Sequence, residues 1–340
     1  MRRPRRGGRP RPGARCPPYT AGRCWSPPHA VVYCVRVGIT RLSDDLVLID
    51  TGYNGTSEAV GVYLLLGERP GLIETGPASR ADTVIEGIRL AGLDPAALEV
   101  IAVTHIHLDH AGGAGTLTQR LPRAHVYVHP VGAPHLVEPT KLLNSAGRLY
   151  GDELVRLFGE TVPVPPARLH VLHDGDALTI GGRRFTAVDT PGHARHHHAY
   201  WDERSGDLFT GDIAGVALPG SRFVRAPTPP PELDVPTWRA SLRRIRALRP
   251  HRLFLTHFGA HDWVDELLGQ LEERLLEGVE QVRGYLASGL DAQAITTRMR
   301  EMAMRQIEAR DGAGAAARYE VIMPIRQSVL GLIRYIEKAG

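Results

Sequence analysis

The chain has 340 residues and a formal net charge of +4, with 43% hydrophobic and 23% charged residues. This balance is typical of a globular protein with ample material for a hydrophobic core. No uninterrupted apolar run approaches the ~20 residues that a membrane-spanning helix needs, so we expect no membrane contact.

The first 36 residues differ in composition from the rest. We expect them to form a disordered extension, or not to belong to the native protein; the alternative is a nucleic-acid-binding arm. They contain no acidic residue and nine arginines, whose removal changes the formal net charge from +4 to −5. The remaining chain is therefore mildly acidic. These arginines are Arg2, Arg3, Arg5, Arg6, Arg9, Arg11, Arg15, Arg23 and Arg36.

The same extension bears on localisation and on cysteine chemistry. An Arg-Arg pair is a feature of some export signals, but no apolar segment of the required ~7–15 residues follows it, so we expect a cytoplasmic protein. All three cysteines, Cys16, Cys24 and Cys34, lie in the extension. We therefore expect no cysteine nucleophile, thiolate ligand or disulfide in the body.

After the extension, the pattern predicts short strands separated by Asp-Asp, Asn-Gly and Arg-Pro-Gly turns. A helix is expected over 81–91, where Val84, Ile88 and Ala91 share one face, and a short helix is expected to end at Leu121. The strands expected in this half cover 39–41, 47–50, 60–66, 71–74, 98–104 and 124–128.

The second half repeats the strand-rich pattern, as a two-sheet sandwich would. Residues 131–167 interrupt it as an insertion, expected to cover the functional site and to contain a helix over 148–158. A proline-rich loop over 227–236 precedes a helix over 237–248. The strands expected here cover 168–172, 177–180, 184–188, 199–202, 208–210 and 252–256.

The C-terminal part is predicted to be helical. Apolar residues at helical spacing form one stripe around 271–286 and a second around 325–336, and Ile295, Met299 and Met302 suggest a helix between them. These helices could form a lid, mediate a homodimer or pack on the sandwich, and the pattern does not distinguish these roles. We divide the chain into the extension (1–36), a catalytic domain (37–261) and a helical region (262–340).

The strand over 98–104 leads into the most informative stretch of the chain. Three imidazoles and one carboxylate fall within six residues, and in extended geometry His105 and His107 point to the same side. Asp109 and His110 would lie on the following turn and face a second position. Imidazole and carboxylate suit zinc, iron or manganese, and two adjacent cations would use all four groups.

This motif, His-x-His-x-Asp-His followed by Gly-Gly, resembles the signature of the metallo-β-lactamase superfamily. The resemblance extends over about 40–257 and includes Leu-Ile-Glu-Thr-Gly (72–76), Thr-Pro-Gly-His (190–193), Thr-Gly-Asp (210–212) and Thr-His (256–257). It implies an α/β fold, an αββα four-layer sandwich to which the C-terminal helices are added.

The resemblance also implies a set of metal ligands. A first site would use His105, His107 and His193, and a second would use Asp109, His110 and His257, with Asp212 bridging the two ions. The complete set favours two metals. We expect zinc, since the motif lacks the glutamate that the flavodiiron branch places in its middle; iron or manganese remains an alternative.

The implied activity is hydrolysis of an ester, thioester or lactone by a metal-bridging hydroxide, similar to the glyoxalase II and lactonase branches. Catalytic roles are assigned to Asp109, Asp212 and His197, the last as a contact to the substrate or its leaving group. Glu74 stands where the family more often has aspartate, and we expect it to be a buried carboxylate near the metal motif.

Three alternatives remain open. An iron-dependent sulfur dioxygenase on the same fold would need only the first site, and a nuclease or nucleic-acid-binding protein would explain the arginines of the extension. The acidic body argues against nucleic acid. A β-lactamase is disfavoured because no export signal is visible. Arg222 and Arg225 could grip an anionic substrate, although arginines on loops are more often simply solvated.

Overall fold

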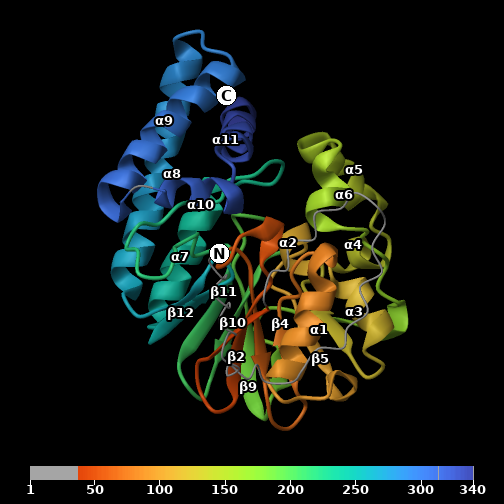
Figure 1. The fold of residues 1–340 in the computed structure, drawn as a ribbon. Coiled ribbons are helices and arrows are strands. Elements are labelled where there is room, and N and C mark those ends of the chain that lie inside the picture. The colour runs from red at the N-terminus through yellow and green to blue at the C-terminus, as the bar shows by residue number, and fades with distance from the viewer. Residues whose placement is uncertain (1–36, 313, 340) are drawn as a thin grey trace, which may run out of the picture. The chain divides into compact units, whose positions relative to one another are not determined.

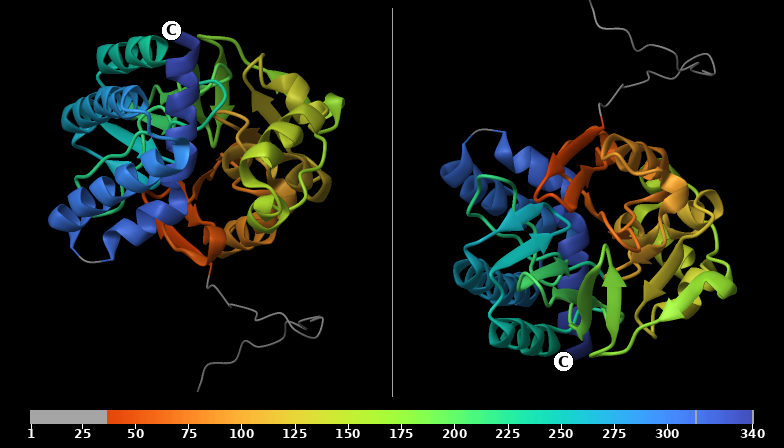
Figure 2. Two further views of the ribbon diagram at one scale, coloured as in Figure 1. Left: turned by 90° about the horizontal axis from the view of Figure 1, so that it is seen from above. Right: turned by 90° about the horizontal axis from the view of Figure 1, so that it is seen from below.

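The computed structural model describes residues 37–312 and 314–339. Within them, two β-sheets lie face to face and helices cover the outer face of each sheet (Figure 1, Figure 2). The expected α/β four-layer sandwich is therefore confirmed. The expectations for residues 1–36, including the three cysteines, concern a segment outside the described residues.

The first sheet runs through its strands in chain order, antiparallel as far as the fourth strand and parallel from there on. Its outer face packs against α1 (Ala81–Leu90) and α3 (Ala114–Arg120), which bury residues such as Val84, Ile88 and Leu117. Its strands are β1 (Gly38–Arg41), β2 (Leu46–Asp50), β3 (Gly61–Leu65), β4 (Gly71–Ile73), β5 (Val100–Ala102), β6 (His125–Val128) and β7 (Leu169–Val171).

The second sheet has the order β13-β12-β11-β10-β9-β8, and only its β11–β12 pair is parallel. Its outer face packs against α7 (Val235–Leu248) and α8 (Val264–Ala287) through a second apolar cluster. Its strands are β8 (Ala177–Ile180), β9 (Arg183–Asp189), β10 (His198–Asp202), β11 (Asp207–Gly211), β12 (Arg252–Leu255) and β13 (Gly259–His261).

An aromatic layer joins the two sheets. The Tyr63 ring of the first sheet meets the rings of Phe209 and Phe254 edge-on, with centroids 5.0 and 5.5 Å away. Its hydroxyl donates to the Leu255 carbonyl oxygen at 2.5 Å, so the one polar atom of this buried ring is satisfied. Facing aromatic rings from interior strands thus pack the two sheets together.

The insertion over 131–167 is helical, but its helices differ from the predicted one. It contains α4 (Ala133–Val137), α5 (Thr140–Tyr150) and α6 (Glu153–Phe158). A single helix over 148–158 is wrong because Gly151 adopts a φ of 54°, which ends α5 and redirects the chain.

In its described residues the C-terminal part forms four helices, which are α8, α9 (Ala292–Asp311), α10 (Ala315–Ile322) and α11 (Ile325–Ala339). The predicted stripe is confirmed, since Leu271, Leu275 and Val282 are buried against the second sheet. Among the described residues, no helix combines the length and apolar character that crossing a membrane requires.

Two further expectations fail for tertiary reasons. The strand that begins at Leu169 pairs with β6 in the first sheet, whereas the other strands expected in the second half form the second sheet. The strand expected over 98–104 ends at Ala102, which leaves the metal-binding motif on a loop. The short elements β13 and α10 were not predicted.

Gly192 fixes the loop that follows β9 against α7. Its φ is 134°, and a Cβ there would lie 2.3 to 2.5 Å from the Cα, N and Cβ atoms of Trp238. Its carbonyl oxygen accepts from the Asp234 N–H at 2.8 Å, and Asp234 caps α7. The next residue is His193, so this contact sets the position of a predicted metal ligand.

We expect Gly192→Ala to lower the free energy of unfolding by roughly 3 kcal/mol or more, through overpacking and backbone strain. Gly284→Ala in α8 is the matched control, because a Cβ there meets nothing within 4 Å. Chemical denaturation of both variants measures the difference. Equal stabilities for the two variants would show that the Gly192 contact is not a constraint.

Candidate metal centre

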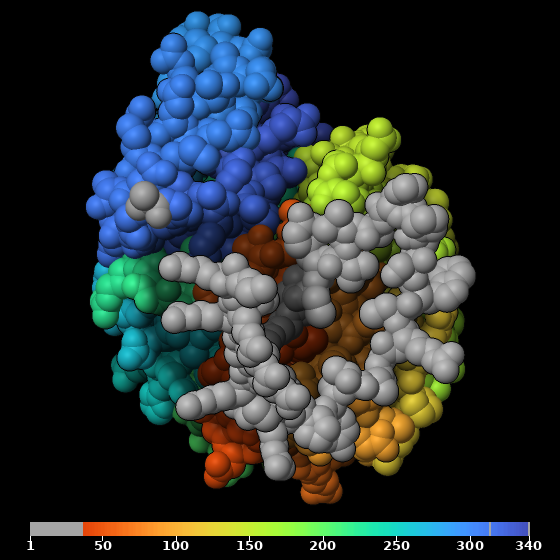
Figure 3. Space-filling model, in the orientation of Figure 1, coloured from red at the N-terminus to blue at the C-terminus, as the bar shows by residue number. Residues whose placement is uncertain are grey.

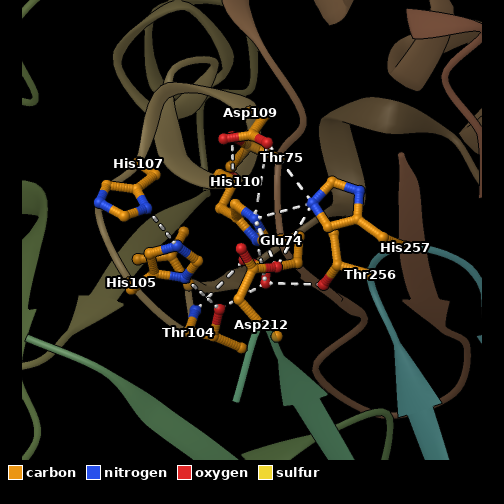
Figure 4. A network of polar contacts seen from close by, with 12 residues as sticks. Glu74, Thr75, Thr104, His105, His107, Asp109, His110, Asp212, Thr256 and His257 are labelled. Atoms are coloured by element: carbon orange, nitrogen blue, oxygen red, sulfur yellow. Dashed lines mark hydrogen bonds and ion pairs between the residues drawn. The ribbon is translucent and has the colours of Figure 1, made fainter. Parts of the chain in front are cut away.

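The predicted metal ligands all follow the ends of strands at one edge of the two sheets. His105 and His107 lie on the loop after β5, and Asp109 and His110 lie on the one-turn helix α2 (Leu108–Ala111). His193, Asp212 and His257 follow β9, β11 and β12. Figure 4 shows the convergence of the side chains that follow β5, β11 and β12 with those of α2.

Four of these side chains form a first group. Nε2 of His105 lies 2.9 Å from Nδ1 of His107, which lies 3.0 Å from Nε2 of His193. Asp212 Oδ2 completes the group at 3.3 Å from the same His193 nitrogen. All four residues offer a ligand atom within 4.8 Å of one another.

A second group lies on the other side of Asp212. Nε2 of His257 is 3.3 Å from Nε2 of His110 and 3.4 Å from Oδ2 of Asp109. Asp212 Oδ1 lies 3.2 Å from the His110 nitrogen and 3.3 Å from that of His257. The two carboxylate oxygens of Asp212 therefore face different groups, the arrangement that a bridging ligand requires.

The hydrogen bonds of the rings show which nitrogens carry protons. Nδ1 of His193 faces the Pro227 carbonyl oxygen at 2.8 Å, and Nδ1 of His257 faces that of Ala59 at 2.6 Å. Since a carbonyl oxygen only accepts, each Nδ1 carries a proton, and Nε2 of each ring points into the site. Asp212 Oδ1 is buried and has no hydrogen-bond partner in the described part of the chain.

The imidazole lone pairs and the carboxylate oxygens in this site repel one another unless a positive charge lies between them. Burial, with the neighbouring histidines, lowers the pKa values of His105 and His107 well below the usual range. Burial raises the pKa values of the carboxylates, but the facing histidines lower them by more. The pKa of Asp212 is therefore well below its usual value, and that of Asp109 is about 2. The groups thus fit divalent cations bound by neutral imidazoles and ionised carboxylates.

His110 carries the opposite shift. Burial lowers its pKa, but the carboxylates of Asp212, Asp109 and Glu74 outweigh this effect and raise the pKa well above its usual range. The excess negative charge around this ring is what a bound cation would neutralise.

Glu74 is fully buried beneath both groups, as expected. Its Oε1 accepts from the Thr104 hydroxyl at 2.6 Å, from His110 Nδ1 at 2.9 Å and from the Thr256 hydroxyl at 3.1 Å (Figure 4). Because the Thr104 hydroxyl donates to Glu74, its oxygen is free to accept from His105 Nδ1 at 3.0 Å. One carboxylate thereby orients a ring in each group.

The substrate contact expected of His197 is wrong. This side chain is fully buried: its Nδ1 bonds with the Thr190 hydroxyl at 2.9 Å, and its Nε2 accepts from the Asp212 N–H at 3.2 Å. His197 therefore positions the backbone of Asp212. Its neighbour His196 reaches the cavity beside the metal groups, and burial, with nearby His193, lowers its pKa to about 3.

A cavity of about 270 Å³ opens onto both groups. The insertion and the C-terminal helices form opposite parts of its wall, and Figure 3 shows them (yellow-green and blue) side by side at the surface. The expectation that the insertion covers the site is confirmed. Apolar lining residues include Leu142, Leu149, Phe158, Ile322 and Met323.

The two arginines suggested for anion binding do not line this cavity. Arg222 pairs with Glu266 at 2.6 Å, and buried Arg225 donates to the Met323 carbonyl oxygen at 2.9 Å. Both therefore connect the loop after β11 to the C-terminal helices.

We expect Glu74→Gln to weaken zinc binding by about 10- to 100-fold, because the amide nitrogen would replace Oε2, which accepts from the Thr104 N–H at 3.2 Å, and the remaining neutral oxygen is a weaker acceptor. Competition with a chromogenic chelator measures the affinity, and circular dichroism confirms folding. Glu86→Gln, at an exposed position of α1, is the matched control. A folded Glu74→Gln protein with unchanged affinity would contradict the assigned role.

Two curated proteins are similar in sequence to about half of this chain. ST1585, a metallo-beta-lactamase fold-containing protein of Sulfurisphaera tokodaii, is 32% identical over 165 residues, 48% of this chain and 61% of that protein. A hydroxyacylglutathione hydrolase of Synechococcus is 32% identical over 167 residues, 48% of this chain and 54% of the enzyme. The matches thus span about half to three-fifths of these curated relatives.

Solved structures agree in fold. The crystal structure of ST1585 superposes with a TM-score of 0.58 at 29% identity, covering 68% of this chain and 86% of that one. TTHA1429 of Thermus thermophilus gives 0.62 at 23% identity, covering 88% and 95%, a likeness of fold alone. The family model of the metallo-beta-lactamase superfamily matches residues 31–257, more than half of the chain. The chain belongs to the metallo-β-lactamase superfamily.

Proposed function

We propose that the protein is a dinuclear metal-dependent hydrolase that cleaves an ester, thioester or lactone. The observation that carries this proposal is the position of Asp212, whose two carboxylate oxygens face two separate ligand groups. His105, His107 and His193 would hold one ion, and Asp109, His110 and His257 the other. Zinc is the first choice, with iron or manganese as alternatives.

Two bound cations would lower the pKa of a shared water towards neutrality and polarise the scissile carbonyl group. The protein itself supplies geometry: Glu74 and backbone carbonyls orient the rings, and His197 holds the backbone of Asp212. Asp109 and Asp212 keep the site anionic, so they attract and retain the cations. No side-chain nucleophile is required.

The cavity supports a small acyl substrate. Its apolar walls exclude water from the reacting bond and contact a hydrocarbon part of the substrate. The identity with hydroxyacylglutathione hydrolases also favours acyl transfer to water. The presence of the second group favours this reaction over that of a sulfur dioxygenase, which would use the first group alone.

We expect Asp212→Ala to reduce turnover by several orders of magnitude, because both groups lose their shared ligand. The assay is a panel of thioesters, lactones and aryl esters with zinc-, iron- and manganese-loaded protein. Asp152→Ala, at an exposed position without an assigned role, should retain full turnover.

The same panel includes a persulfide with oxygen-uptake detection and a phosphodiester. Oxygen consumption by the iron-loaded protein, without turnover of any acyl substrate, would overturn the proposal in favour of a dioxygenase. Turnover of the phosphodiester alone would instead identify a nuclease.

A further inference from the structure

His198 is a buried imidazole that the metal centre does not use. It is the first residue of β10 and is fully buried, yet neither of its ring nitrogens has a hydrogen-bond partner among the described residues. Leaving a polar group unsatisfied in the interior costs ~1–3 kcal/mol, so such a group calls for a ligand or an ordered water.

Two further metal-binding side chains surround this ring. His129 follows β6 and Asp189 ends β9, and each offers a ligand atom within 4.8 Å of the others and of His198. Nε2 of His129 lies 3.0 Å from Oδ1 of Asp189, and the rings of His129 and His198 have centroids 4.6 Å apart. None of the three residues belongs to the groups around Asp212.

The cluster lies where the two sheets meet. Asp189 and His198 are directly opposed in the β9–β10 ladder of the second sheet, whereas His129 comes from the first sheet. The residues between Asp189 and His198 form the loop that carries His193. A shared ligand here would tie the two sheets together at the base of that loop.

The protonation state and the charges of this cluster favour the binding of a cation. Burial, and next His129, lowers the pKa of His198 to about 4, so at neutral pH the ring is uncharged and can donate a lone pair. Arg244, the nearby cation, is neutralised by Asp174 at 2.8 Å. The Asp189 side chain is 35% exposed, which gives an ion access from solvent.

We propose that His129, Asp189 and His198 form a further metal site for a divalent ion of the zinc class, separate from the Asp212 centre. Two imidazoles and one carboxylate are a ligand set that zinc accepts, and a water molecule would complete a tetrahedron. The proposal stands on these residues alone and does not depend on the proposed hydrolase.

Binding would alter one existing contact. The Val131 N–H donates to Nδ1 of His129 at 3.0 Å, so the proton of the neutral ring is on Nε2. An ion bound at Nε2 moves that proton to Nδ1, which can then no longer accept from Val131. The backbone at Val131 must turn away, and Val131 lines the cavity of the Asp212 centre.

The test compares the full-length wild type with Asp189→Ala and His198→Gln after saturation with zinc and removal of free metal. We expect elemental analysis to show one ion fewer per chain in each variant than in the wild type. Anomalous scattering at the zinc edge should place a peak between the three side chains in wild-type crystals only.

The control is His170→Gln, which removes one ring of an exposed histidine pair on the first sheet and should leave the zinc content unchanged. Equal zinc content in the wild type and both cluster variants, or no anomalous peak at the cluster, would overturn the proposal. Because the readout is a difference of one ion at a located site, it is independent of how many ions the Asp212 centre holds.

Discussion

The organisation of this protein depends on one electrostatic constraint, the convergence of imidazole lone pairs and carboxylates at the edge of two sheets. Backbone carbonyls fix the protons of His193 and His257 on the far side of each ring. Glu74 does the same for His110 directly and for His105 through Thr104. The site that results is rich in negative charge and in lone pairs, and the two carboxylate oxygens of Asp212 face its two groups.

Much of this centre could be predicted from the chain because its parts are local motifs. Each ligand follows a short apolar strand, and strands that end at one edge bring such residues together. The convergence of these side chains around Asp212 and the burial of Glu74 were therefore expected from the motifs, and so was the apolar stripe that buries α8. The apolar stripe follows from helical spacing of three to four residues, whereas the grouping of distant side chains was implied by the resemblance of the separate motifs to the superfamily.

The features that failed depend on tertiary neighbours. His196, His197 and His198 are adjacent and chemically identical in the chain, yet they face the cavity, the Asp212 backbone and the His129 cluster respectively. Their different roles follow from where β10 begins, at His198, and from the tertiary contacts of each ring. Likewise, β7 pairs with the first sheet although it follows the insertion. Arg225 donates to the carbonyl oxygens of Tyr319 in α10 and of Met323 just after it, and it does not line the cavity.

The most direct test of the central claim is to locate the ions at the Asp212 centre by anomalous diffraction from zinc-loaded crystals. The account predicts two peaks, one on each side of the Asp212 carboxylate, the first among His105, His107 and His193 and the second among Asp109, His110 and His257. A single peak at saturating zinc, on either side of Asp212, would contradict it.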